Sequence, residues 1–499
     1  MTGFTIIDWA VIVLFLLALL LIGYMSAKKT RTASDYALGG RSMNSVMIGI
    51  SLFATLLSTL SYLAYPGEMI KYGPVVFIGL TAFPVAYLIV SRFFIPRFMA
   101  MKVTSAYEIL EIRLGKGSRL LATIFFLSLR FLWMSTIIYA TVDTALIPIF
   151  GLDPSWITPI SLVLAGISVV YTTMGGLKAV VMTDVVQSVV MFAGVLLTIG
   201  VIAWQIGGLQ PLSNPDLYAH WEPIRWAIDA TDRMTIGNIF IMTLVWQVCT
   251  ASSDQMAIQR YLSTKDVRSA VRSYGISIAT SCAIQLLLAV VGLMVMAYFT
   301  YFPDQLLPGT TIFNDADTLF PRFILIGLPT GISGLIAAAI MAAAMSSVSS
   351  GLNSSAVVIQ QDILKPRRPD APEGDELKKV KYISALLGAG VACCCYLISF
   401  VSGNLLDVVI KVVNLVVAPL FVLFFLALFV PFATNRGTVA AGLLSLLTAI
   451  LIAFFEIFGI SVLWIMPCAL IVGVVSGVVL GYLETWWHRR HPAGGVLNS

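Results

Sequence analysis

Four stretches of this 499-residue chain carry hydroxyl, amide and carboxylate side chains inside otherwise apolar segments. They are residues 51–73, 171–187, 246–260 and 337–362. Polar groups in a hydrocarbon environment are costly, so they are functional candidates by default. In the stretch 337–362, hydroxyl oxygens without a fixed carboxylate suit a weakly held monovalent cation better than a divalent one. These stretches therefore predict a path or a binding site for an ion and a polar solute.

The stretch SLFATLLSTLSYLAYPGEMIKYG, at 51–73, indicates an interrupted helix. Ser58 and Ser61 bring hydroxyls to it, and Pro66 with Gly67 is expected to break it. At such a break, freed carbonyls and nearby hydroxyls can bind an ion and a solute near the middle of a membrane. The alternative is structural, because Ser and Thr also bond back to the preceding turn and Pro-Gly can simply end a helix.

The stretch AAAIMAAAMSSVSSGLNSSAVVIQQD, at 337–362, is rich in small and hydroxyl residues. Two neighbouring helical faces carry oxygen atoms, with Ser346, Ser350 and Asn353 on one and Ser347, Ser350 and Ser354 on the other. Such a helix can offer hydroxyl ligands to a cation. Small residues also let two helices approach closely, so a packing role is the alternative.

Two acids lie inside apolar segments. Asp184 follows the tight turn Gly175-Gly176 and needs a cation, a hydroxyl cluster or a bound ion as partner, unless it reaches water at the interface. Asp254 lies near the middle of the apolar segment 236–262, whose inner end is marked by Arg260. So many polar groups in one segment indicate a helix that lines water.

Arg130 and Lys411 are basic residues that also stay within apolar segments. Arg130 could reach the interface or pair with an acid such as Asp143 or Asp254. Lys411 follows Asp407 by four residues, so an i,i+4 ion pair is one explanation. The other is that Lys411 projects into a cavity and binds a carboxylate or hydroxyl of a solute. The residues alone leave both questions open.

Membrane-spanning helices must position these groups. Hydrophobic residues make up 59% of the chain and charged residues 11%, whereas soluble domains carry roughly 45–50% and about 25%. Mean hydropathy is +0.94. A soluble enzyme, a disordered chain and an ordinary DNA-binding protein are thereby excluded. About 20 apolar residues cross a bilayer, and thirteen segments qualify: about 8–27, 43–66, 74–96, 118–149, 155–174, 179–205, 236–262, 270–300, 331–360, 378–402, 405–432, 436–457 and 462–485.

The distribution of Lys and Arg predicts the orientation of these helices. With thirteen spans, most basic residues fall in loops on one side, and four fall on the other: Lys71, Arg225, Arg233 and Arg322. Basic loops face the cytoplasm, so we expect the N-terminus outside and the C-terminus inside. Residues 1–8 carry no positive charge and no signal-peptide cleavage pattern, so we expect the first segment to be a membrane helix. A multi-pass protein of the plasma (inner) membrane is predicted.

Four blocks resemble the sodium:solute symporter family, which includes the sodium–glucose, sodium–iodide, monocarboxylate, sialic-acid and proline cotransporters. They are SLFATLLSTLSYLAYPGE, YTTMGGLKAVVMTDVVQ, SSDQMAIQRYLSTKD and AMSSVSSGLNSSA, in the family's order and together covering essentially the whole chain. The resemblance implies one all-α membrane transport domain over 1–499 with a leucine-transporter-like core. Its parts would be an extra helix at 8–27, two inverted five-helix repeats at 43–205 and 236–432, and two helices at 436–485.

The resemblance also implies the ion ligands. Sodium would be bound by the carbonyls of Ala54, Leu57 and Ala343 and by the hydroxyls of Ser346 and Ser347. The family's acid after the Gly-Gly turn falls on Asp184, which with Ser350 would hold a second cation or act as a coupling acid. Members that carry two sodium ions have a hydroxyl residue where this chain has Ala343, and this departure counts against a second sodium ion.

Solute contacts in the family come from the broken helix, the next helix, and the seventh and eleventh spans. The matching positions are Ser58, Ser61, Gly79, Leu80, Thr250, Asp254 and Lys411. The acid or amide that many sugar carriers place near Leu80 is missing, which counts against a glucose-type solute. Lys411 favours an anionic or hydroxyl-rich solute.

We therefore expect a secondary active transporter that moves a small organic solute together with sodium by alternating access. The solute would be a sugar, a sialic acid or a carboxylate, and we expect neither a nucleic-acid partner nor an obligate protein partner. A proton-coupled or uncoupled carrier on the same fold, and a membrane sensor that binds solute without moving it, are the alternatives. Enzyme signatures such as HExxH or a nucleophile elbow do not occur in the sequence.

Overall fold

The computed structural model describes residues 4–232, 234–364, 373–398, 405–455 and 457–490, and of residues 373, 405–413 and 458 it describes the backbone alone. This part of the chain is helical, apart from one isolated bridge between Arg225 and Thr235. The helices of the first half are α1 Ile6–Ala27, α2 Ala33–Leu38, α3 Ser45–Leu56, α4 Thr59–Tyr72, η1 Gly73–Thr81, α5 Ala82–Ile89, η2 Val90–Phe94, α6 Ile95–Ala100, α7 Glu108–Arg113, α8 Lys116–Thr141, η3 Val142–Leu146, α9 Ile147–Phe150, η4 Pro154–Trp156, α10 Ile157–Gln205, η5 Gln210–Ser213 and η6 Pro215–Tyr218.

Those of the second half are α11 Ile236–Ser253, α12 Gln255–Leu262, α13 Val267–Tyr301, η7 Pro303–Gln305, α14 Ala316–Ile326, α15 Ile332–Val358, η8 Ile359–Leu364, α16 Glu373–Ile398, α17 Leu405–Phe429, α18 Asn435–Phe455, η10 Ile457–Gly459, η11 Val462–Trp464 and α19 Ile465–Arg490. The prediction of an all-helical membrane protein is confirmed.

Each of the thirteen predicted apolar segments falls on helices of the structure. Within the described residues, ten helical stretches are long and apolar enough to cross a membrane. Two of them, Thr59–Ala100 and Pro154–Gln205, each join two predicted segments. A further predicted segment corresponds to α17, whose side chains are described from Asn414 onward. The predicted spans and the observed helices therefore agree.

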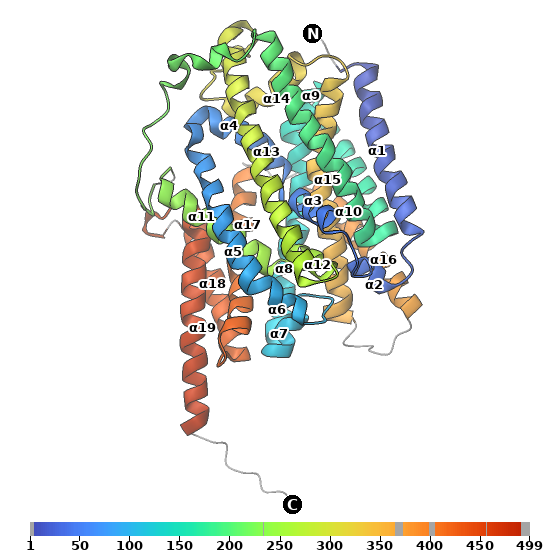
Figure 1. Cartoon of the computed structure of the whole chain (residues 1–499), viewed down its shortest axis with the longest axis vertical. Helices are drawn as coiled ribbons and strands as arrows, with labels where there is room; N and C mark the ends of the chain where they lie inside the picture. Colours follow the sequence, from blue (N-terminus) through green and yellow to red (C-terminus); the bar gives the residue numbers. More distant parts are fainter. Residues whose placement is uncertain (1–3, 233, 365–372, 399–404, 456, 491–499) are drawn as a thin grey trace, which may run out of the picture.

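The helices pack as one upright bundle (Figure 1). α10 packs against α15, α1 and α16, whereas α13 packs against α3 and α4. α17, α18 and α19 pack on one another at one edge of the bundle. α1 begins at one end of the long axis and α19 ends at the other, as expected for an odd number of crossings.

Two of the predicted spans are interrupted in the structure. The second predicted span divides at Leu57 and Ser58 into α3 and α4. The prediction that Pro66 and Gly67 break this span is wrong, because both lie inside α4, which continues to Tyr72. The seventh span divides at Asp254 into α11 and α12, a break that the sequence analysis did not foresee.

The turn predicted at Gly175-Gly176 is present as a kink in α10. Gly176 has φ 59° and ψ −150°, a region that L-residues rarely adopt. A Cβ at this position would also lie 2.7 Å from the carbonyl oxygen of Tyr36. Only glycine therefore allows α2 to pack against the kink.

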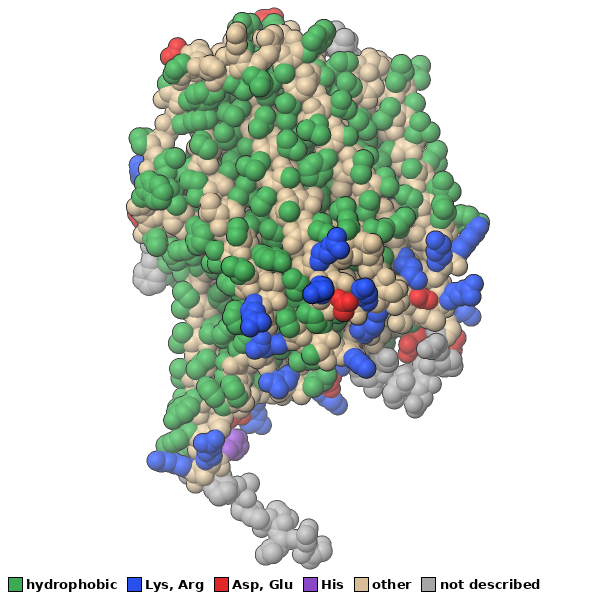
Figure 2. Space-filling model, viewed as in Figure 1, with side chains coloured by type: hydrophobic (Ala, Val, Ile, Leu, Met, Phe, Trp, Pro, Cys, Tyr) green, Lys and Arg blue, Asp and Glu red, His purple; other side chains and the backbone are tan. Residues whose placement is uncertain are grey.

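The surface reflects a membrane environment (Figure 2). Hydrophobic side chains cover most of the visible face, and Lys and Arg gather toward the end that carries α2, α6, α7 and the end of α19. α15 is the opposite case, because nearly all of its side chains, including its serines, are buried. The small-residue helix therefore lies inside the bundle.

Candidate functional site

The break between α3 and α4 frees backbone carbonyls. In a continuous helix the Ala54 and Thr55 carbonyls would accept from N–H groups four residues further on. Leu57 and Ser58 are extended instead, with ψ 111° and 158°. Ser58 Oγ accepts from the Ser61 N–H at 3.1 Å and caps α4. The capping serine thus begins the second half of the helix and leaves the carbonyls at the end of α3 available.

Two hydroxyls of α15 meet these carbonyls. Ser346 Oγ donates to the Ala54 carbonyl at 2.9 Å and lies 3.1 Å from the Ala343 carbonyl. Ser347 Oγ donates to the Thr55 carbonyl at 3.2 Å. All five residues are buried. A hydroxyl oxygen also has lone pairs that it can turn toward a cation, so this contact between α3 and α15 can hold a monovalent ion.

Four of the five predicted sodium ligands thus lie together, and the fifth, Leu57, lies at the break itself. Thr55 is a neighbour that sequence reasoning did not assign. Its carbonyl accepts from Ser347, and its hydroxyl lies 2.8 Å from Ser350 Oγ. The spacing of Ser51 and Thr55, one helical turn apart, is the signal that could have identified this face of α3.

Asp184 lies at the centre of a second buried cluster. One of its oxygens accepts from Ser51 Oγ at 2.5 Å and from the Arg260 guanidinium at 3.1 Å. Its other oxygen has no hydrogen-bond partner among the described residues. Asp184 is fully buried, so the alternative of an interfacial acid that reaches water is wrong. The partners are a cation and a hydroxyl.

Arg260 belongs to this cluster although its place in the sequence does not indicate it. The sequence places it at the inner end of a span, but its side chain is 1% exposed. The guanidinium donates to Ser350 Oγ at 2.6 Å, to Ser51 Oγ at 2.9 Å and to the Met256 carbonyl at 2.9 Å, besides Asp184. Because α12 begins anew at Asp254, the arginine points into the bundle. A fixed cation therefore contacts both Asp184 and Ser350.

The break between α11 and α12 is held by a further buried ion pair. Asp254 caps α12 by accepting from the Met256 N–H at 2.9 Å. Its other oxygen accepts from Arg130 of α8, so of the partners proposed for Arg130 the structure selects Asp254 over Asp143. The guanidinium also lies 5.7 Å from the centre of the Phe126 ring. Both oxygens of Asp254 are thus engaged within the protein.

The predicted solute residues lie on elements that touch one another. η1, which carries Gly79 and Leu80, packs against α4 and α11, which carry Ser61 and Thr250. A Cβ on Gly79 would lie 2.5 Å from Thr243 Oγ1, so η1 and α11 approach closely there. Ser58 and Ser61 hydroxyls lie 3.1 Å apart. The Thr250 hydroxyl is buried and has no hydrogen-bond partner among the described side chains and backbone. Lys411 lies outside the residues whose side chains are described.

Two interrupted helices, a buried carbonyl–hydroxyl contact and a polar interior define a membrane transporter. Comparison with known proteins agrees. The model of the sodium:solute symporter family matches residues 36–445. The sodium/sialic acid symporter SiaT of Proteus mirabilis is 30% identical over 456 residues, which are 90% of each chain. Sodium-coupled monocarboxylate transporter 1 of Xenopus laevis is 32% identical over 465 residues, covering 89% of this chain and 71% of the relative.

A solved structure of a substrate-bound, outward-open sodium-coupled sialic acid symporter has the same fold. It superposes with a TM-score of 0.86 at 28% identity, over 96% of this chain and 98% of the other. The chain therefore belongs to the sodium:solute symporter family. It has the leucine-transporter-like fold, it is a sodium-coupled symporter of small organic solutes, and it is not an enzyme.

Proposed function

We propose that sodium binds where α15 meets the break between α3 and α4, with the carbonyls of Ala54, Leu57 and Ala343 and the hydroxyls of Ser346 and Ser347 as ligands. The contact of the two serine hydroxyls with freed carbonyls of α3 supports this assignment above all. The site joins a helix of the first proposed repeat, 43–205, to one of the second, 236–432. Bound sodium would tie the repeats together and hold one conformation.

The two broken helices support the proposed repeats. α3–α4 opens the first and α11–α12 opens the second, as expected when the same five-helix unit occurs twice in inverted order. A solute bound between the breaks would contact Ser58, Ser61, Thr250 and the η1 segment at Gly79 and Leu80. Asp254 would act there by shaping α12 and Lys411 by offering a positive charge.

Coupling follows from linkage. If sodium favours the conformation that binds solute, solute must favour sodium binding by the same factor. With the proposed orientation, N-terminus outside and C-terminus cytoplasmic in the plasma membrane, one sodium ion that moves inward with a neutral solute through 100 mV releases ~2.3 kcal/mol. At ~1.4 kcal/mol per decade, this supports about forty-fold accumulation. One sodium ion that moves with a monoanionic solute carries no net charge, so the sodium concentration gradient alone then drives accumulation.

Asp184 and Ser350 are proposed as a coupling pair and not as a second sodium site. A second ion would have to replace the Arg260 guanidinium, which already contacts both residues. Ala343, which replaces the hydroxyl residue of members that carry two sodium ions, also counts against a second sodium site.

The solute class is proposed as a sialic acid, a short monocarboxylate or a related hydroxyl-rich or anionic molecule, as the names of the relatives suggest. Thermal stabilisation of the purified protein by a panel of such solutes, each in sodium and in choline, tests it, because a ligand of the native state raises stability by mass action. A solute that stabilises only with sodium supports symport. Uptake into proteoliposomes that is unchanged in choline at fixed pH would refute sodium coupling.

A further inference from the structure

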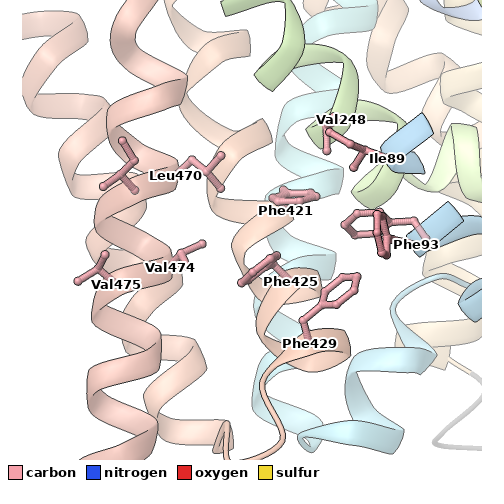
Figure 3. A pocket seen from close by; sticks show the side chains of 11 residues that line it. Ile89, Phe93, Val248, Phe421, Phe425, Phe429, Leu470, Val474 and Val475 are labelled. Atoms are coloured by element: carbon pink, nitrogen blue, oxygen red, sulfur yellow. The ribbon is translucent and has the colours of Figure 1, made fainter. Parts of the chain in front are cut away.

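An apolar groove lies between η2, α17 and α19 (Figure 3). Its volume is about 470 Å³, and apolar side chains alone line it. Phe421, Phe425 and Phe429 form a ladder on one face of α17, because they recur at helical spacing. Leu470 and Val474 of α19 face them from the other side in Figure 3.

The groove opens to the surrounding membrane. Phe93 on one wall is 48% exposed, and Val475 on the other is 57% exposed. The first wall is unusual, because η2 is a π-helical turn, and such turns often mark functional positions. It brings two consecutive residues, Phe93 and Phe94, to the same groove.

An arginine stands at one end of the groove and touches its lining. The Arg97 guanidinium lies 4.5 Å from the centre of the Phe429 ring, and it donates to the Phe93 carbonyl at 2.6 Å. Arg92 is exposed beside Phe93, and Arg113 donates to the Ala427 carbonyl at 3.1 Å.

These three arginines lack acidic partners in the described part of the chain. None of them takes part in an ion pair there, although Arg119, Arg130 and Arg260 do. Arg97, which has no acidic partner there and lies against Phe429 in the lining of a lipid-facing groove, is complementary to a negative headgroup. Anionic lipids attract Lys and Arg placed at the membrane surface.

We propose that this groove binds one anionic phospholipid. An acyl chain lies along the phenylalanine ladder of α17, and the phosphate lies at Arg97, with Arg92 and Arg113 adding positive charge. With the proposed orientation, the lipid comes from the cytoplasmic leaflet. The proposal depends only on the shape and charge of this groove at the edge of the bundle. Evidence against it would therefore leave the proposed sodium site unaffected.

Native mass spectrometry of the full chain in detergent tests the headgroup contact. The delipidated protein is incubated with phosphatidylglycerol and phosphatidylcholine that carry identical acyl chains. Arg97→Gln should lower the preference for phosphatidylglycerol about five-fold, the effect of one basic residue at ~1 kcal/mol. Arg31→Gln is the matched control, because Arg31 is also exposed at the basic end but lies beside α2. An unchanged preference in Arg97→Gln would overturn the proposal.

A second pair of variants tests the groove itself. Val474→Trp fills it and should abolish retention of both lipids, whereas Val472→Trp, on α19 but outside the lining, should not. Equal competition by glycerol phosphate, which has no acyl chain, would overturn the role of the groove. A dimer that forms in detergent and is lost in Val474→Trp would also overturn the role of the groove in lipid binding, because a second copy of the chain would then occupy the groove. If Val474→Trp does not fold, the two arginine variants decide.

Discussion

The variant Ser346→Ala tests the proposed ion site most directly. It removes one hydroxyl from the contact between α3 and α15 and leaves the backbone carbonyls in place. A contact to a charged group contributes about 1.5–3 kcal/mol, whereas a hydrogen bond between neutral groups contributes about 1 kcal/mol. In the sodium-bound state the variant loses the contact of the hydroxyl with the ion. In the sodium-free state it loses only the 2.9 Å hydrogen bond to the Ala54 carbonyl.

The difference between these two losses sets the expected change in sodium affinity. It amounts to about 0.5–2 kcal/mol, or about a 2- to 30-fold rise in the sodium concentration for half-maximal uptake. Adding Ser347→Ala should raise it further, because a second hydroxyl ligand of the ion is removed, whereas only the weaker, neutral bond to the Thr55 carbonyl is lost in the sodium-free state. The solute concentration for half-maximal uptake should rise too, because coupling is reciprocal.

The assay is the initial rate of solute uptake into proteoliposomes at varied sodium, with choline keeping the ionic strength constant. Ser349→Ala is the matched control, since Ser349 is also buried in α15 but its hydroxyl donates to the Ser346 carbonyl within the same helix. Ser346→Thr, which keeps a hydroxyl, should retain most of the affinity. If folded Ser346→Ala shows the sodium dependence of the wild type, α15 does not bind the ion and the reasoning is refuted.

Three further outcomes concern stability. Arg260→Met should lower the free energy of unfolding by about 3–5 kcal/mol, because it leaves the Asp184 charge buried and unpaired. The double variant Arg260→Met/Asp184→Asn should recover part of this loss. An Arg260→Met variant with the melting temperature of the wild type would contradict the ion pair. Gly176→Ala should lower the free energy of unfolding by about 1–3 kcal/mol, because an alanine would be strained at the φ of 59°. Gly166→Ala, where a Cβ meets nothing within 4 Å, should leave the stability unchanged. Equal melting temperatures for the two variants would refute the strain at Gly176. Partial burial raises the pKa of Asp35, but hydrogen bonds that include one from a lysine of α10 outweigh it, so the pKa lies below its ordinary value of 3.8. Ionised Asp35 therefore stabilises the fold above pH 3.8, and this contribution is lost as the pH falls below that value. The difference in melting temperature between wild type and Asp35→Asn should disappear below about pH 4. A difference that does not change with pH would exclude this contribution.

The spans could be predicted because the signal is local. Crossing a bilayer requires about 20 apolar residues in a row, and that requirement is written in each segment separately. Gly176 was recognisable for a similar reason, since a Gly-Gly pair in an apolar run indicates a turn. The serines of α15 were recognisable because a helix that carries so many hydroxyls needs a reason to be in a membrane.

The positions of the helix breaks could not be predicted from the same signals. Pro66 indicated a break, yet α4 runs through it, as membrane helices tolerate proline when neighbouring groups satisfy the backbone. The actual break has neither glycine nor proline. It exists because Ser58 caps α4 and because Ser346 and Ser347, almost three hundred residues away, bind the carbonyls that the break exposes.

Arg260 shows the same limit for charge. In the sequence it looks like a basic residue at the membrane surface, and residue counts place it in a loop. Its true environment depends on the direction in which α12 leaves Asp254 and on three other helices that supply Asp184, Ser51 and Ser350. Arg130 is a milder case, because two acids were candidates and only packing could choose Asp254.

Composition and hydropathy were enough to show that this protein is all-helical and which apolar runs are long enough to span the bilayer, because both depend on the free energy of transferring short segments from water to lipid. That it is a transporter, and which of its residues would bind an ion, followed from its resemblance to a known family. Tertiary structure alone decided where helices break, which carbonyls are free, and whether a buried charge has a partner. Those properties depend on contacts of a few ångströms between helices distant in the chain, and hydropathy and spacing do not encode them.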